Sequence, residues 1–193
     1  LLQDLVSAVP DGVITLELSE NKLLVTTDGY ESVINGTSAE EFPVMPAIKD
    51  GSTLRIQAGL LKKSLQQTIG AASGDDARPI LTAVYMHSHE GSLYVVATDS
   101  YRLAEKKVQP CKENVSLLIP APAFSDVLRI LQDDTTDVEV TYDELQVRFV
   151  VGDVELITRL IDGNYPDYRK LIPADFKTTA TVKKADFINV TKV

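Results

Sequence analysis

Residues 98–102, near the middle of the chain, combine side chains that could bind a partner. They read Thr-Asp-Ser-Tyr-Arg and lie between two apolar runs. Asp and Ser are ordinary turn residues because their short side chains bond nearby backbone groups. Threonine, tyrosine and arginine are more than a turn requires, and a guanidinium can engage a carbonyl or a carboxylate. The segment is therefore either a hairpin tip or a binding surface, and short motifs by themselves favour the first.

The histidines and the cysteine give little support to metal or nucleophilic chemistry. His87 and His89 alternate along a predicted strand and so share one face. Structural zinc usually needs four ligands, and no further cluster of histidine or cysteine lies near this pair in the sequence. Cys111 has no histidine at the spacing of a nucleophile motif. We predict neither a metal site nor a nucleophilic centre.

The acidic and glycine residues add no catalytic signal. Asp133, Asp134 and Asp137 fall in a predicted turn and are most simply a solvated loop. The glycines are scattered, and none opens a predicted helix at the spacing of a phosphate-binding loop. We therefore predict no cofactor.

The elements that position residues 98–102 form a repeated β-α-β-β-β unit of about sixty residues. Alternating and helical apolar patterns predict one copy over 52–109 and a second over 115–161. Reversals at Glu90-Gly91 and Asp99-Ser100 should join the three consecutive strands of the first copy. The predicted buried faces of the two helices are Leu61, Leu65, Thr68 and Ile69, and Phe124, Val127, Leu128 and Leu131.

The N-terminal residues 1–46 read as a third copy that lacks its first strand. A helix at 1–9 precedes strands at 13–18, 22–27 and 30–36, and the match to the second copy is offset by 123 residues, the separation of Gly29 and Gly152. Residues 180–190 restart the strand-then-helix pattern. Two successive copies should pack two helices on one side of sheets of about eight strands. The proline-containing connections 42–51 and 165–173 should be extended links between domains.

Composition indicates a globular protein without membrane insertion. The chain has 193 residues, of which 44% are hydrophobic and 24% charged, with no run of eighteen apolar residues and no signal-like start. Its single cysteine fits a reducing cytosol. The net charge of −9 argues against an ordinary basic nucleic-acid binder, but it allows cations gathered on one face. Because the sequence opens in mid-pattern without methionine, we expect it to be a piece of a longer protein.

Four motifs, in this order and at these separations, resemble the bacterial DNA polymerase III beta subunit family, the replicative sliding clamps. They are "AEEFP" at 39–43, "ATDSYRLA" at 97–104, "LLIPA" at 117–121 and "LIDGNYPDYRKLIP" at 160–173. The resemblance implies an α+β clamp fold. It makes residues 1–48 the C-terminal half of a first domain, 49–173 a complete second domain and 174–193 the beginning of a third.

The resemblance also implies a non-catalytic role. Such subunits form a head-to-tail homodimeric ring around duplex DNA, independently of base sequence, with helices lining the hole and sheets outside. Their implied partners are the DNA polymerase III alpha subunit, the clamp loader and other proteins that carry a clamp-binding motif. The implied location is the bacterial cytoplasm, at the nucleoid, with no membrane association.

Carried across position by position, the family's partner-peptide pocket includes the polar segment. Ser100 stands where glycine is also common in the family, and Tyr101 where histidine is common. The N-terminal copy keeps Thr-Asp-x-Tyr at 27–30, whereas Arg102 and Leu103 occur only in the middle copy, which narrows the functional prediction to these two residues. The whole implied pocket is Leu81, Thr98, Ser100, Tyr101, Arg102, Leu103, Pro166, Lys170 and Leu171.

Four basic residues are the implied DNA contacts. Lys62, Lys63 and Arg129 lie off the apolar faces of the predicted helices, where a solvated surface is the alternative explanation. Arg78 lies in the loop 74–79 and matches a family position near the pore. The aromatic residues found beside that position in some clamps are replaced here by proline and isoleucine, which weakens the prediction for Arg78.

Two other functions compete with the clamp. One is a repeat-built adaptor that binds peptides without encircling DNA, and the other is a hydrolase or nucleotide-binding enzyme on a repeated α+β unit. Helices gathered on the concave side of a curved sheet would favour the clamp. An enclosed pocket of polar, titratable groups would favour the enzyme.

Overall fold

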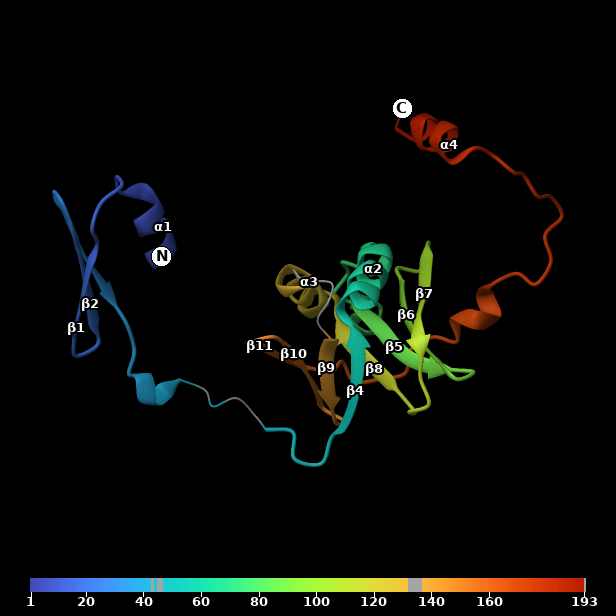
Figure 1. The fold of residues 1–193 in the computed structure, drawn as a ribbon, viewed down its shortest axis with the longest axis horizontal. Helices are drawn as coiled ribbons and strands as arrows, with labels where there is room; N and C mark the ends of the chain where they lie inside the picture. Colours follow the sequence, from blue (N-terminus) through green and yellow to red (C-terminus); the bar gives the residue numbers. More distant parts are fainter. Residues whose placement is uncertain (43, 45–46, 132–136, 193) are drawn as a thin grey trace. The chain divides into compact units, whose positions relative to one another are not determined.

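The computed structural model describes residues 1–42, 44, 47–131 and 137–192 (Figure 1). They divide into two compact units, residues 1–47 and residues 48–193. Pro43 of the first predicted link and Asp133 and Asp134 of the predicted acidic turn lie outside the described residues.

The first unit is a helix followed by a three-stranded antiparallel sheet in the order β1-β2-β3. The reversals use left-handed backbone at Glu20 and at Gly29, where glycine adopts a φ of +88° without strain. A helix followed by such a meander is the arrangement predicted for the third, incomplete copy. The elements are α1 Leu2–Ala8, β1 Thr15–Ser19, β2 Lys22–Thr27, β3 Tyr30–Asn35 and the 3₁₀ helix η1 Ala39–Glu41.

The second unit contains two four-stranded antiparallel sheets. Its strands are β4 Ser52–Gln57, β5 Ala83–His89, β6 Ser92–Thr98, β7 Leu103–Pro110, β8 Ser116–Pro120, β9 Asp137–Tyr142, β10 Gln146–Val151 and β11 Val154–Arg159. Its helices are α2 Ala58–Thr68, α3 Ala121–Ile130 and α4 Lys184–Val190, with the 3₁₀ helices η2 Ile69–Ala71, η3 Pro79–Thr82 and η4 Tyr168–Leu171.

The two copies within this unit exchange their first strands. The sheet orders are β11-β10-β9-β4 and β7-β6-β5-β8, so β4 completes the sheet of the second copy and β8 that of the first. Leu54 of β4 lies opposite Val140 of β9, and Val84 of β5 lies opposite Ile119 of β8. Neither four-stranded sheet can form from one copy alone, so the copies form a single folding unit.

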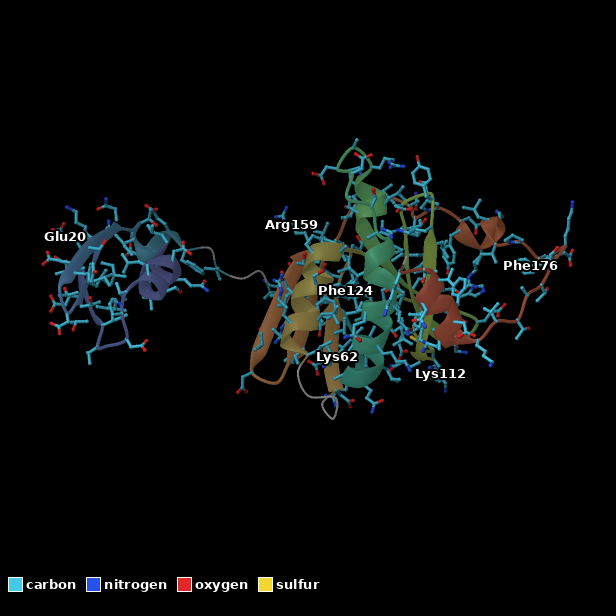
Figure 2. All side chains as sticks on the ribbon, turned by 90° about the horizontal axis from the view of Figure 1, so that it is seen from above. Glu20, Lys62, Lys112, Phe124, Arg159 and Phe176 are labelled. Atoms are coloured by element: carbon cyan, nitrogen blue, oxygen red, sulfur yellow. The ribbon has the colours of Figure 1, made fainter. Side chains whose placement is uncertain are left out.

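Helices α2 and α3 lie side by side on the same side of the strands (Figures 1 and 2). The predicted helix faces are confirmed, because Leu61, Leu65, Phe124 and Val127 are completely buried. The ring of Phe124 packs against that of Phe149 on β10, with centroids 5.6 Å apart. Removing such side chains from water is the main stabilising contribution, at about 1.5–3 kcal/mol for each large apolar residue.

Local structure differs from the predictions at several positions. Residues 180–183 form no strand, since an extended segment needs a neighbouring strand to satisfy its backbone groups. The apolar run that starts at Ile80 becomes a strand only at Ala83, because Pro79 starts a 3₁₀ turn. The link 165–173 is not extended throughout, since η4 interrupts it. Among the described residues, the helices are all too short or too polar to span a membrane.

Candidate functional site

The loop between β6 and β7 is a compact hydrogen-bonded structure. Thr98 pairs with Leu103, so the loop has four residues, 99–102, and the predicted two-residue turn is corrected. The Asp99 carboxylate accepts the backbone N–H groups of Tyr101 and Arg102, each at 3.0 Å. These bonds, that of Arg102 first, lower the pKa of the Asp99 carboxyl below its ordinary value. Ser100 has a φ of +78°, a conformation that favours glycine.

The loop presents one aromatic and one cationic side chain to solvent. Tyr101 is 94% exposed, and no other large hydrophobic side chain described here is more exposed. The Arg102 side chain is 66% exposed while its Nε lies 3.0 Å from Asp99 Oδ2. Arg78 reaches the same loop, because its Nη1 donates to Ser100 Oγ at 3.3 Å and its Nε pairs with Asp75. Arg78, which was predicted to face DNA, thus makes its hydrogen bond to the β6–β7 loop.

The sheet β7-β6-β5-β8 has a second buried surface on the face away from the helices. Pairing places Thr98 beside Leu103, and the alternation of β6 and β7 puts both side chains on this outer face. Thr98 and Leu81 are buried, yet neither belongs to the apolar core under α2 and α3. The outer face therefore carries a buried layer that is separate from the core under α2 and α3.

The segment 160–172 crosses this outer face and covers it. The Ile161 N–H donates to the Leu118 carbonyl at 2.9 Å, at the β8 edge. Farther along, the Tyr165 ring stacks on Tyr85 at 4.9 Å, and the Tyr168 hydroxyl donates to Glu105 on β7. Pro166 lies between these two anchors.

Gly163 allows the segment to approach the sheet closely. Its φ is +131°, and a Cβ atom there would lie 2.8 Å from Cδ1 of Ile80. A larger residue would meet both backbone strain and a clash.

A buried polar cluster fastens η4 to three neighbouring strands. Nε2 of His87 on β5 lies 2.8 Å from the Tyr168 hydroxyl, and Nη2 of Arg169 lies 2.8 Å from Glu105 Oε2. The Arg169 guanidinium also stacks 4.9 Å above the Tyr94 ring of β6. Burial, followed by the Glu105 interaction, raises the pKa of Tyr168, so its hydroxyl stays protonated and can donate.

Burial also lowers the pKa of His87, and the nearby Arg169 acts in the same direction. His87 is therefore neutral at physiological pH. The two histidines weighed as metal ligands, His87 and His89, both contact the Tyr94 ring, His87 stacked on it and His89 edge-on. In the part of the chain that the structure describes, no group of three or more His, Cys, Asp or Glu side chains could hold a metal ion.

The structure places the nine predicted pocket residues on the outer-face strands, on η3, in the β6–β7 loop and on the crossing segment. Thr98 and Leu103 lie opposite each other on the outer face of the sheet, Leu81 is buried in η3, and Ser100, Tyr101 and Arg102 lie in the β6–β7 loop. Pro166, Lys170 and Leu171 come from the crossing segment. Lys170 pairs with Asp167 at 2.7 Å, and Leu171 is 74% exposed, a large apolar side chain at the surface.

The predicted DNA contacts on the helices lie on the opposite side of the sheets. Lys63 is exposed, Lys62 is partly buried, and Arg129 is 78% exposed in an ion pair with Asp126 at 2.6 Å. Helix α2 carries two lysines and no acidic residue. Helix α2 is therefore basic although the chain is acidic overall, whereas the one arginine of α3 is paired with an aspartate of the same helix.

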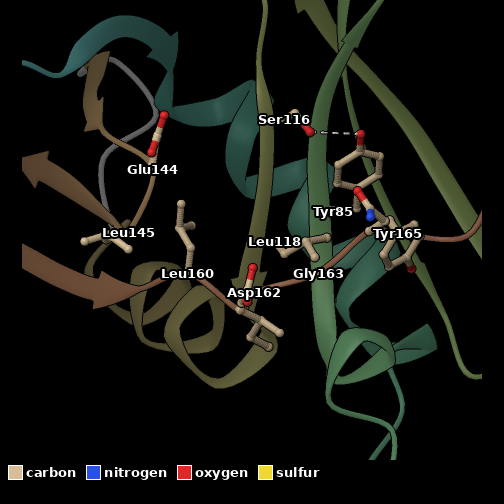
Figure 3. A pocket seen from close by; sticks show the side chains of 11 residues that line it. Tyr85, Ser116, Leu118, Glu144, Leu145, Leu160, Asp162, Gly163 and Tyr165 are labelled. Carbon is tan, nitrogen blue, oxygen red and sulfur yellow. Dashed lines mark hydrogen bonds between the residues drawn. The ribbon is translucent and has the colours of Figure 1, made fainter.

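A cavity of about 380 Å³ lies near the outer face, where residues 160–165 pass β8 (Figure 3). Tyr85 and Ser116 share a 3.2 Å hydrogen bond at its wall, and Glu144 and Asp162 are its acidic residues. None of the nine predicted pocket residues lines it.

Sequence reasoning missed the residues that hold the crossing segment in place. Tyr165, Tyr168 and Arg169 stand inside the quoted motif at 160–173, and their partners Glu105 and His87 are far away in sequence. The available signal was the alternation of Tyr85, His87 and His89, which places three rings on one face of a strand.

Comparison with known proteins identifies relatives over nearly the whole chain. Residues 55–167 match the family described as DNA polymerase III beta subunit, central domain. The beta sliding clamp of Bacillus subtilis is 34% identical over 189 residues, which cover 96% of this chain and 50% of the relative. That of Streptococcus pneumoniae is 34% identical over 182 residues, covering 92% and 48%. The chain thus spans about half the length of the curated relatives it matches.

Solved structures of sliding clamps resemble this chain over about nine-tenths of its length. The crystal structure of the DNA polymerase sliding clamp from Bacillus subtilis superposes with a TM-score of 0.76 at 32% identity, covering 90% of this chain and 47% of that one. A DnaN sliding clamp from Bartonella birtlesii bound to griselimycin gives 0.79 at 28% identity, covering 90% and 49%. The α+β clamp fold that the family resemblance implied is confirmed.

Proposed function

This chain belongs to the DNA polymerase III beta subunit family, and we propose that it is part of a sliding clamp that encircles duplex DNA and tethers replication proteins to it. Residues 1–48 would be the C-terminal half of the first clamp domain, 49–173 the second domain and 174–193 the start of the third. The complete ring would be a head-to-tail homodimer, because repeated heterologous contacts close when the rotation permits.

The observation that carries this proposal is the separation of two surfaces by one sheet. Helix α2 packs on β6 and β7 from one side, with Val95 and Ala97 in the core between them. The crossing segment covers the other side of the same strands, where Tyr168 bonds Glu105. DNA beside the helices and a partner peptide on the outer face could therefore be bound at the same time.

The chemistry of each surface suits its proposed ligand. Lys62, Lys63 and Arg129 would meet phosphates, a contact that is independent of base sequence and weakened by salt. Leu81, Leu103, Pro166 and Leu171 would receive the apolar side chains of a peptide, while Arg102 would engage its carbonyl or carboxylate groups. Griselimycin, which is bound to the clamp from Bartonella birtlesii, is a candidate ligand of the same surface.

Such a protein would act by tethering and would need no catalytic residues. A polymerase attached to a topologically linked ring has a high effective concentration at the primer end. The proposed partners are the DNA polymerase III alpha subunit, the clamp loader and other proteins with clamp-binding motifs. The proposed location is the bacterial cytoplasm, at the nucleoid.

The deciding experiment compares closed circular with linear DNA. The natural protein that contains this chain, loaded on closed circles by a clamp loader, should remain bound in high salt and be lost when the circle is cut. Equal loss from both forms would contradict encirclement. An adaptor that binds peptides alone would retain peptide affinity and show no retention on either DNA.

A further inference from the structure

The cluster around Tyr168 joins a surface segment to the sheet through buried polar bonds. His87 is only 7% exposed and Tyr168 only 3%, while Glu105 and Arg169 are partly buried. Four elements contribute: β5, β6, β7 and η4. Polar groups cost free energy when buried unless they are bonded, so such a cluster has a strongly preferred geometry. Nε and Nη2 of Arg169 are buried without a hydrogen bond, and Nη2 is held by its ion pair with Glu105.

Proton counting specifies one order of donors and acceptors. Tyr168 has a single hydroxyl proton, which it donates to Glu105. The neutral His87 must then carry its proton on Nε2 and donate it to the Tyr168 oxygen, 2.8 Å away. Nδ1 of His87 is left at the longer distance of 3.3 Å from the Ser88 carbonyl. The bonds therefore run from His87 through Tyr168 to the carboxylate that also pairs with Arg169.

We propose that this chain of bonds is a latch, with the Tyr168 hydroxyl as its positioning group, that sets where the segment 163–172 lies on the outer face. The inference rests on the proposed function for its consequence, because Pro166, Lys170 and Leu171 belong to the proposed peptide surface. None of the latch residues belongs to the nine pocket residues, so the latch acts on affinity through the position of the segment.

The segment has few other attachments that could replace the latch. Within η4 the backbone hydrogen bonds are local: Tyr168 donates to Pro166 at 2.7 Å, and Lys170 and Ile172 donate to Asp167 and Arg169, each at 3.3 Å. Lys170 and Leu171 are exposed, and their side chains do not anchor η4 to the sheet. The attachment at the other end, Tyr165 on Tyr85, is a ring stack.

The test compares two tyrosine-to-phenylalanine variants of the same segment. Tyr168→Phe removes the central hydroxyl and keeps the ring. Tyr165→Phe is the matched control, because the Tyr165 hydroxyl belongs to the same segment but lies outside the cluster, near the Thr98 backbone and without a well-formed hydrogen bond. Hydrogen–deuterium exchange of residues 163–172 should rise about tenfold in Tyr168→Phe, the scale of one lost charge-assisted bond. It should be unchanged in Tyr165→Phe, and equal exchange in both variants would overturn the latch.

A second readout separates positioning from general stability. Binding of a synthetic peptide from the C-terminus of the DNA polymerase III alpha subunit, measured by fluorescence anisotropy, should weaken several-fold in Tyr168→Phe and stay unchanged in Tyr165→Phe. Phe149→Leu, a core variant on β10, should lower stability while leaving peptide affinity and segment exchange unchanged. An equal loss of affinity in Phe149→Leu would overturn the positioning role.

A wild-type protein that fails to bind the peptide would instead contradict the proposed function. The exchange experiment would still decide whether the latch holds the segment. The two failures are thus distinguishable.

Discussion

The Thr98 hydroxyl donates a 2.7 Å hydrogen bond to the backbone carbonyl of Arg102, across the mouth of the loop that joins β6 and β7. The same oxygen accepts the Ser100 N–H at 3.2 Å. Thr98 and Asp99 thus bond the loop from its inside, which leaves the side chains of Tyr101 and Arg102 outside. The turn residues and the candidate binding residues of this segment are therefore separate sets.

Replacing Thr98 by valine should destabilise the protein by about 1 kcal/mol, because a buried hydroxyl bond is lost and the Arg102 carbonyl loses a partner. Urea denaturation measures the free energy of unfolding. Thr98→Ser restores the hydroxyl and should recover most of the loss. If Thr98→Val and Thr98→Ser have the same free energy of unfolding, the hydrogen bond does not stabilise the loop.

Replacing Arg102 and Leu103 together by alanine should abolish binding of the alpha-subunit peptide while unfolding stays cooperative. The change removes the loop's exposed guanidinium and part of the apolar layer next to Thr98. Anisotropy in the natural protein measures the affinity. Arg148→Ala, at the Glu155 ion pair on β10, is the matched control and should bind normally. Unchanged affinity in the double variant would refute the site.

Gly163→Ala should cost about 1–3 kcal/mol, because a φ of +131° is unfavourable for any side chain and the new Cβ would meet Ile80. Adding Ile80→Ala removes the clash but not the backbone strain, so the double variant should recover only part of the loss. Gly74→Ala, where a Cβ would meet no atom within 4 Å, is the control. The midpoints of thermal unfolding of Gly163→Ala, the double variant and Gly74→Ala measure these differences.

Stability should fall as pH drops from about 7 towards 5, partly because of His87. Its folded pKa lies below the ordinary value of 6.5, so the unfolded chain binds the proton more readily and acid favours unfolding. Glu105, Arg169, His89 and Tyr168 are the charged or titratable groups that act on this ring.

Urea midpoints at several pH values check this prediction. His87→Gln should flatten the acid limb of the profile, although it also weakens the latch at all pH values. A wild-type slope in His87→Gln would show that other groups cause the acid sensitivity.

Replacing Lys63 and Arg129 by alanine should weaken binding to linear duplex DNA and reduce its salt dependence. If each side chain neutralises one phosphate, the slope of log K against log salt should shrink by about 1.8, or about 0.9 per contact. Lys112→Ala, an exposed lysine between β7 and β8, is the control. Equal slopes in the three proteins would remove the helical side as the DNA surface.

Local periodicity in the sequence was enough to predict most elements of the second unit. Leu61, Leu65, Phe124 and Val127 are buried as predicted, because a helix returns to the same face every three to four residues whatever surrounds it. The Glu90-Gly91 reversal also follows from local chemistry, since both residues adopt positive φ. The repeat itself is a property of the sequence.

Tertiary structure alone decided which distant segments meet. Tyr168 bonds His87, 81 positions earlier, and Leu54 pairs with Val140 across the strand exchange. Local patterns contain no information about such partners, because an exposed strand edge or an outer-face ring could pair with several different segments. The outer-face site, with its sheet layer and its crossing segment, therefore became visible only once packing had selected one set of long-range contacts.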